Sequence, residues 1–241
     1  MKKITVILAA LILFLNNLTA QIETYNYFAE AMHEDSLGKP KESIVDYTLA
    51  LNTNPTDSTL KAQCFLNRAY EKELLENFSG AVDDFTSVIA MYPTQGDTYF
   101  NRGVAKDSSN DLQGGLADFT KAIELNPNDF EAYTDRGFTK NNLGDHLGAI
   151  DDFTSAIKIN PKDWIAYFDR ALTKHKLGDL NGALSDLNSA IEIYPDFADA
   201  YYTRGNVKTD LGDKKGAKAD YKKAKELYAM RKKKRDVGGV E

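Results

Sequence analysis

Few side chains in this chain of 241 residues could carry out covalent or metal chemistry. The three histidines, His33, His146 and His175, do not share the spacing that zinc ligands show. The single cysteine, Cys64, has no histidine beside it to activate it as a nucleophile. It is either a reactive or intermolecular thiol or a small buried apolar residue, and we favour the second interpretation. We therefore expect no enzyme activity, no catalytic residues, no metal site and no cofactor.

Carboxylates are plentiful, and paired carboxylates can serve as general acid and base. However, six aspartates recur at one phase of the sequence: Asp46, Asp84, Asp118, Asp152, Asp186 and Asp220. Arginines and lysines recur at two other phases: Arg68, Arg102, Arg136, Arg170 and Arg204, and Lys72, Lys106, Lys140, Lys174 and Lys208. Such recurrence indicates repeated structure. We expect a ladder of ion pairs in which the aspartate of one repeat contacts the arginine of the next, as Asp118 would contact Arg136.

The period is 34 residues, numbered here from Phe130 as position 1. The repeat beginning there has a small residue at position 8 (Gly137), alanine at 20 (Ala149), an aromatic at 24 (Phe153) and proline at 32 (Pro161). The copies are 24–57, 62–95, 96–129, 130–163, 164–197 and 198–231, with residues 58–61 inserted after the first. Five of the six prolines fall at position 32, so the period runs through nearly the whole chain.

This pattern resembles the tetratricopeptide repeat, a helix–turn–helix unit with the same residue types at these positions. The resemblance implies an all-α fold, a right-handed α–α superhelix of six helix–turn–helix repeats. Helix A would cover positions 1–14 of each repeat and helix B about 17–30. The resemblance also implies a concave surface lined by helix A and a role in binding proteins.

Turn residues punctuate each copy at fixed places. Glycine at position 15, as in Gly144, would close helix A, and aspartate at position 16, as in Asp145, would cap helix B. Glu76 stands at position 15 of the second copy without an evident reason. The third copy has Ser109–Asn110 at the turn and Gly114–Gly115 opening helix B, so we expect the loosest packing there. Gly137 at position 8 indicates a close approach by helix B.

The N-terminus has the pattern of a secretory signal. Lys2 and Lys3 precede the apolar run Ile4–Leu15, and a short polar stretch ends at Ala20, after which we place cleavage. The alternative is an uncleaved N-terminal anchor. We expect residues 1–20 to be a signal peptide and the mature chain to be exported, either to a periplasm or outside the cell.

The charge is distributed unevenly along the chain. The formal net charge is −6, of which residues 1–20 carry +2 and residues 231–241 carry +3, leaving −11 for residues 21–230. An acidic repeat body argues against nucleic acid as a partner. Residues 232–241 form a basic tail, and Tyr228–Arg235 either prolongs the last helix B or forms a short polar cap. We do not expect membrane contact once the signal is removed.

Aromatic and acidic residues at the helix A positions suggest a groove for an extended or helical peptide with apolar anchors and basic flanks. The candidate partner-binding residues are Phe28, Tyr70, Asp97, Phe100, Glu131, Asp135, Phe138, Phe168, Asp169 and Tyr202. The aromatics could instead pack helix A on helix A. We expect a scaffold or adaptor that binds another protein or peptide; the alternative is a structural subunit of a cell-envelope assembly that uses its edges or its basic tail.

Overall fold

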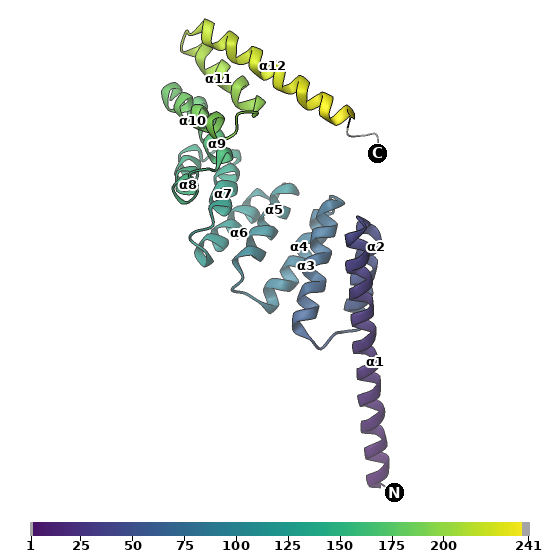
Figure 1. Ribbon diagram of the computed structural model, residues 1–241. Helices are drawn as coiled ribbons and strands as arrows, with labels where there is room; N and C mark the ends of the chain where they lie inside the picture. Colours follow the sequence, from purple (N-terminus) through teal and green to yellow (C-terminus); the bar gives the residue numbers. More distant parts are fainter. Residues whose placement is uncertain (1, 238–241) are drawn as a thin grey trace. The chain divides into compact units, whose positions relative to one another are not determined.

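The computed structural model describes residues 2–237, with side chains from residue 11 to residue 233, and these residues form helices joined by short turns (Figure 1). In chain order the helices are α1 (Lys2–Ser36), α2 (Pro40–Asn52), α3 (Ser58–Leu74), α4 (Phe78–Met91), α5 (Gly96–Ser108), α6 (Leu112–Leu125), α7 (Phe130–Asn142), α8 (His146–Ile159), α9 (Trp164–Lys176), α10 (Leu180–Ile193), α11 (Ala198–Asp210) and α12 (Lys214–Val237). Two compact units, Met1–Leu125 and Asn126–Glu241, contain α1–α6 and α7–α12.

Each unit is a stack of three antiparallel helical hairpins. In the first unit α1 packs on α2, α3 on α4 and α5 on α6, and the hairpins join through α2–α3 and α4–α5 contacts. In the second unit α7–α8, α9–α10 and α11–α12 are joined in the same way through α8–α9 and α10–α11. The predicted all-α helical-repeat fold is confirmed.

The turns are closed by the residue types that the sequence indicated. Gly38, Gly144, Gly178 and Gly212 have positive φ angles of 67° to 90°. At the same position Glu76 and Asn110 are left-handed too, with φ of 58° and 67°. Left-handed backbone costs an ordinary L-residue about 1–2 kcal/mol, so Glu76 is held there by the geometry of the turn. The residue after the turn caps helix B in the later hairpins, as when Asp145 accepts from the Gly148 N–H at 3.0 Å, whereas Lys39 at the start of α2 makes no side-chain cap hydrogen bond.

The core lies between the two helices of each hairpin, at positions 8, 20 and 24. Ala149 and Phe153 on α8 are fully buried against α7. A Cβ added to Gly137 would lie 2.8 Å from the Phe153 ring and 3.2 Å from the Ala149 carbonyl oxygen. The expected close approach at position 8 is therefore present, and its cause is the aromatic ring at position 24.

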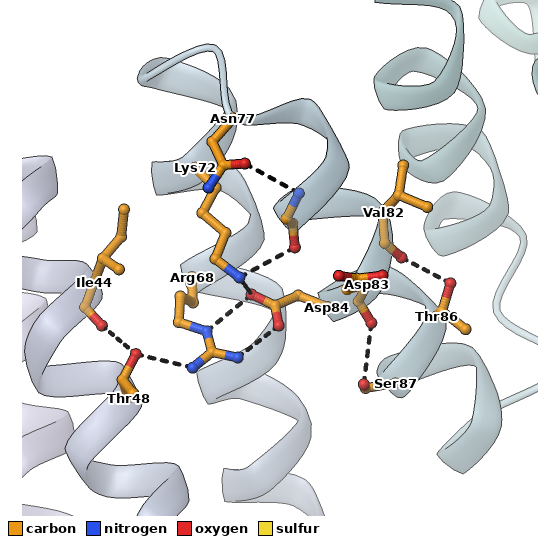
Figure 2. A network of polar contacts seen from close by, with 11 residues as sticks. Ile44, Thr48, Arg68, Lys72, Asn77, Val82, Asp83, Asp84, Thr86 and Ser87 are labelled. Atoms are coloured by element: carbon orange, nitrogen blue, oxygen red, sulfur yellow. Dashed lines mark hydrogen bonds and ion pairs between the residues drawn. The ribbon is translucent and has the colours of Figure 1, made fainter. Parts of the chain in front are cut away.

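The recurring charged residues form a buried triad inside each hairpin from the second onward, and Figure 2 shows the triad of α3 and α4. Arg68 donates hydrogen bonds to both carboxylate oxygens of Asp84, from Nε at 2.8 Å and from Nη2 at 2.6 Å. Lys72 Nζ lies 2.7 Å from the same carboxylate. The Arg68 guanidinium also lies over the Phe65 ring. Its remaining nitrogen, Nη1, donates to Thr48 of the preceding repeat at 2.9 Å (Figure 2).

The predicted direction of these ion pairs was wrong. Arg136 bonds Asp152 of its own hairpin at 2.9 and 2.8 Å instead of Asp118. Positions 7 and 23 are equally far from the turn at position 15, and chain reversal brings such positions opposite one another. The contact with the preceding repeat is made by Nη1, which donates to Thr86 from Arg102 at 3.0 Å and to Asn188 from Arg204 at 2.8 Å.

The first hairpin departs from the triad. It has Glu30 and Glu34 where later repeats have arginine and lysine, so Asp46 faces carboxylates. Burial, followed by the charges of Glu30 and Glu34, raises the pKa of Asp46. Lys39, which follows the turn, pairs with Glu34 at 2.8 Å.

The expectation of loose packing in the third repeat was also wrong. Helices α5 and α6 pack as closely as the other hairpins. The Asp107 side chain lies over Gly115, where an added Cβ would be only 1.8 Å from its Oδ1. Gly115 therefore leaves room for the Asp107 side chain between α5 and α6, whereas Gly114 faces the capping residue Asp111.

Both terminal helices continue beyond their hairpins. Helix α1 is one uninterrupted helix through Ala20, and the side chains of residues 1–10, which include most of the predicted apolar run, lie outside the described residues. Helix α12 has 24 residues where α10 has 14 and begins at the same position of the repeat. Position 32 there is Ala229 instead of proline, so the helix is not stopped and Tyr228–Arg235 prolongs it. Among the residues searched, no helix combines the length and hydropathy needed to cross a membrane.

Candidate protein-interaction surface

The predicted site residues fall into two separate sets, one in each unit. Phe28, Tyr70, Asp97 and Phe100 belong to the first unit, and Glu131, Asp135, Phe138, Phe168, Asp169 and Tyr202 belong to the second. The residues of each set have their contacts within their own unit. The assignment of these residues to partner binding remains a prediction.

Aromatics at position 5 support the hairpin core. Phe28 packs on Tyr47 with ring centroids 5.9 Å apart, and Phe100 packs on Phe119 at 5.8 Å. Phe168 likewise packs against the buried cluster of its hairpin. These three side chains are only partly exposed, so the interpretation that they pack between helices explains much of their presence.

Aromatics at position 9 point to solvent. Tyr70 is 40% exposed and Phe138 is 50% exposed. Tyr70 lies edge-on to Phe85, and its hydroxyl accepts from Asn101 Nδ2 at 2.8 Å. Tyr202, at position 5 of the last repeat, is 51% exposed, and its ring packs on Tyr221 with centroids 5.6 Å apart.

In the second unit four of the exposed apolar residues lie on the first helices of the three hairpins. We call Phe138, Ile165, Leu172 and Tyr202 the α7–α9–α11 face. Helix α9 contacts both α7 and α11, so the three helices are neighbours. Two polar contacts hold them: Thr134 Oγ1 donates to Asp163 Oδ2 at 2.9 Å between α7 and α9, and His175 Nε2 lies 2.7 Å from Asp210 Oδ2 between α9 and α11.

The α7–α9–α11 face is acidic outside the triads. Its three helices carry five carboxylates that are not part of a triad: Glu131, Asp135, Asp169, Asp199 and Asp210. The same three helices carry one lysine outside the triads, the exposed Lys176. Burial, then the charges of Asp163 and Asp135, raises the pKa of Asp169 to about 7. A cation placed beside this carboxyl would favour its ionised form.

The residues considered for chemistry have structural surroundings. Cys64 is fully buried among apolar residues of the first unit, and burial raises the pKa of its thiol to about 11, which keeps it protonated and unreactive. His146 bonds the Asn141 side chain across a turn. Among the described residues, no three histidine, cysteine, aspartate or glutamate side chains form a group able to hold a metal ion.

Sequence models of the tetratricopeptide repeat match this chain in four places. One such model matches residues 119–151, and a second matches residues 96–129 and 198–229. A third model, described as a TPR repeat, matches residues 173–212. The chain is a tetratricopeptide-repeat protein. No curated protein sequence matches it.

Solved structures of TPR proteins share the fold. A tetratricopeptide-repeat protein from Parabacteroides merdae is 19% identical with a TM-score of 0.75, covering 88% of this chain and 85% of its own. YrrB, described as a TPR protein with an unusual peptide-binding site, is 24% identical with a TM-score of 0.61 over 72% of this chain and 88% of its own. MamA is 24% identical with a TM-score of 0.64 over 68% of this chain and 96% of its own.

Sequence reasoning missed an aromatic cluster at the junction of the fifth and sixth repeats. Phe197 occupies the N-cap position of α11, where earlier repeats have the capping residues Asp129 and Asp163, and it makes no cap hydrogen bond. Its ring instead packs on Trp164 at 4.6 Å and on Phe168 at 4.7 Å. The sequence signal for this cluster was Phe197 at a position where a capping residue is expected. An N-cap side chain contributes about 1 kcal/mol to helix stability, so a residue that cannot cap indicates another stabilising contact, here aromatic packing.

Proposed function

We propose that this TPR protein is an interaction scaffold whose α7–α9–α11 face binds a peptide or a helix of another protein. The observation that carries the proposal is the row of exposed apolar side chains, Phe138, Leu172 and Tyr202 among them, set among carboxylates. Exposed apolar groups with a polar rim are typical of interfaces. The peptide-binding site named for YrrB, a protein of the same fold, supports a peptide as ligand.

Binding, and not catalysis, is the activity we propose. The most regular polar groups, the Asp–Arg–Lys triads, are occupied in holding hairpins together. The lone thiol is buried and protonated. These side chains hold the fold together. In the exposed apolar row Tyr202 also packs on Tyr221, with ring centroids 5.6 Å apart, whereas Phe138 and Leu172 present 50% and 38% of their surface to solvent.

The test is affinity capture with the chain as bait, beside a variant with Phe138→Ala, Ile165→Ala and Leu172→Ala. Phe100 and Phe168 are left intact because they support hairpin cores. A matched control replaces three exposed apolar residues on second helices: Val45→Ala, Leu49→Ala and Leu147→Ala. A partner that binds the wild type and the control, and is lost from the face variant, supports the proposal. A partner that binds all three proteins equally contradicts it and favours the edges or the tail, as in an envelope assembly.

We also propose that the chain is exported after cleavage at Ala20. The support is the Lys2–Lys3 pair, the apolar run and the small residue that follows. Intact-mass spectrometry of the protein from its envelope and secreted fractions tests this. A mass that begins at Gln21 is expected, and a full-length chain would instead favour an uncleaved anchor.

A further inference from the structure

The basic residues of this protein are concentrated in its last helix, α12, and not only in the tail at residues 232–241. Helix α12 contains 11 of the chain's 30 lysines and arginines but only three acidic residues, which gives it a charge of +8. Residues 21–213 carry 17 basic and 32 acidic residues, which gives −15. One molecule therefore carries a strongly basic helix at its C-terminal end and an acidic body.

The ten residues by which α12 exceeds α10 combine this charge with apolar side chains. We call residues 228–237 the α12 extension. Tyr228 is the first residue of the α12 extension, and its hydroxyl donates to Asp199 Oδ1 on α11. Two residues further, Met230 is 57% exposed, and Arg231, Lys232 and Lys233 that follow it are exposed as well. Figure 1 shows the helix continuing past the end of its partner α11.

The chemistry of the α12 extension matches the ligand expected for the α7–α9–α11 face. A partly exposed aromatic, Tyr228, and a flexible methionine supply apolar contacts, and the cations that follow suit the carboxylates Glu131, Asp135 and Asp169. An amphipathic helix laid against exposed apolar side chains is an established mode of recognition. The α12 extension emerges as part of a continuous helix, so it is already in the conformation for such binding.

We propose that the α12 extension of one molecule docks on the α7–α9–α11 face of a second copy of this chain. The two surfaces are different parts of the molecule, so the contact is head-to-tail and repeats from copy to copy into a ring or an open filament. This inference rests on the proposed function, because it uses the same face and names one occupant for it.

Sedimentation velocity of the purified chain at low and high salt tests the proposal. The wild type is expected to self-associate with rising concentration and to dissociate in high salt, since exposed charges are screened. An extension variant (Arg231→Glu, Lys232→Glu, Lys233→Glu) and a face variant (Asp135→Asn, Phe138→Ala, Asp169→Asn) should each associate at least tenfold more weakly. The control Lys214→Glu, Lys215→Glu, Lys218→Glu makes the same charge change at the start of α12 and should associate like the wild type.

Mixing the two weakened variants is the decisive arm. The extension variant keeps an intact face and the face variant keeps an intact extension, so a one-to-one complex should form in the mixture although neither protein associates alone. A wild type that stays monomeric at every concentration overturns the inference, and so does a control as weak as the extension variant. If the wild type is monomeric while a captured partner still depends on the face, only this inference fails and the proposed function stands.

Discussion

At the residue scale, the triads are the recurring polar contacts inside the second to sixth hairpins. Asp84 is almost fully buried and is held by Arg68 and Lys72 (Figure 2). Removing the carboxylate charge leaves two cations in a partly desolvated site with no counter-charge. Removing one partner of a buried ion pair is far more costly than the net contribution of the pair.

We expect Asp84→Asn to lower the free energy of unfolding by about 3 kcal/mol. Urea unfolding followed by circular dichroism measures the change. Asp83→Asn is the matched control, because Asp83 is the adjacent residue on α4 and its side chain is exposed. Equal stability of the two variants would show that the triad contributes nothing.

The carboxyl of Asp169 predicts a pH-dependent effect on stability. Its pKa in the folded chain, about 7, lies above the ordinary value of 3.8. Ionising it therefore costs the folded state free energy as the pH rises from about 4 to 7, and the cost is full above pH 7. We expect Asp169→Asn to stabilise the protein by about 1–2 kcal/mol at pH 8 and much less at pH 5.

Thermal unfolding at the two pH values measures this difference. Glu131→Gln, which removes an exposed carboxylate from α7, should change stability similarly at both. A gain from Asp169→Asn that is the same at pH 5 and pH 8 would mean that this carboxyl is not desolvated in the folded protein.

At the scale of the element, the hairpin is defined by how closely its two helices approach at position 8. Gly137→Ala would gain about 1 kcal/mol in helix propensity but requires the Phe153 ring to move. The second repeat accommodates Ala69 beside Phe85, so this movement is possible. We expect Gly137→Ala to change the melting temperature little and Gly137→Leu to lower it clearly, because a branched side chain cannot fit beneath the ring. Equal melting temperatures of the two variants would contradict the packing argument.

At the scale of the whole molecule, stability should be local, because the described helices contact chiefly their neighbours in the sequence. We expect Asp84→Asn to speed amide hydrogen exchange in α3 and α4, and less strongly in α2 and α5. Exchange in α9–α12 should not change. Hydrogen–deuterium exchange with mass spectrometry measures this. Uniformly faster exchange along the chain would show that the protein unfolds as one cooperative unit.

The sequence by itself determined the hairpins. Glycine after four of the six first helices, aspartate at most of the caps that follow and proline at position 32 act on their immediate neighbours, and so does Ala229, whose presence lets α12 continue. Close packing at position 8 could be predicted for the same reason, since a repeated small residue has a steric cause. Most of the predicted site residues also lie on the first helices as expected, because helical periodicity sets their face.

Only the tertiary structure decided which side chains meet and which remain exposed. The partner of Arg136 follows from chain reversal at the turn, which brings Asp152, and not Asp118, across from it. Phe100 and Phe138 were both predicted to line the groove, yet Phe100 packs on Phe119 whereas Phe138 is 50% exposed. Burial and the partners of a charge depend on distances across the fold, and residue type and spacing alone do not contain them.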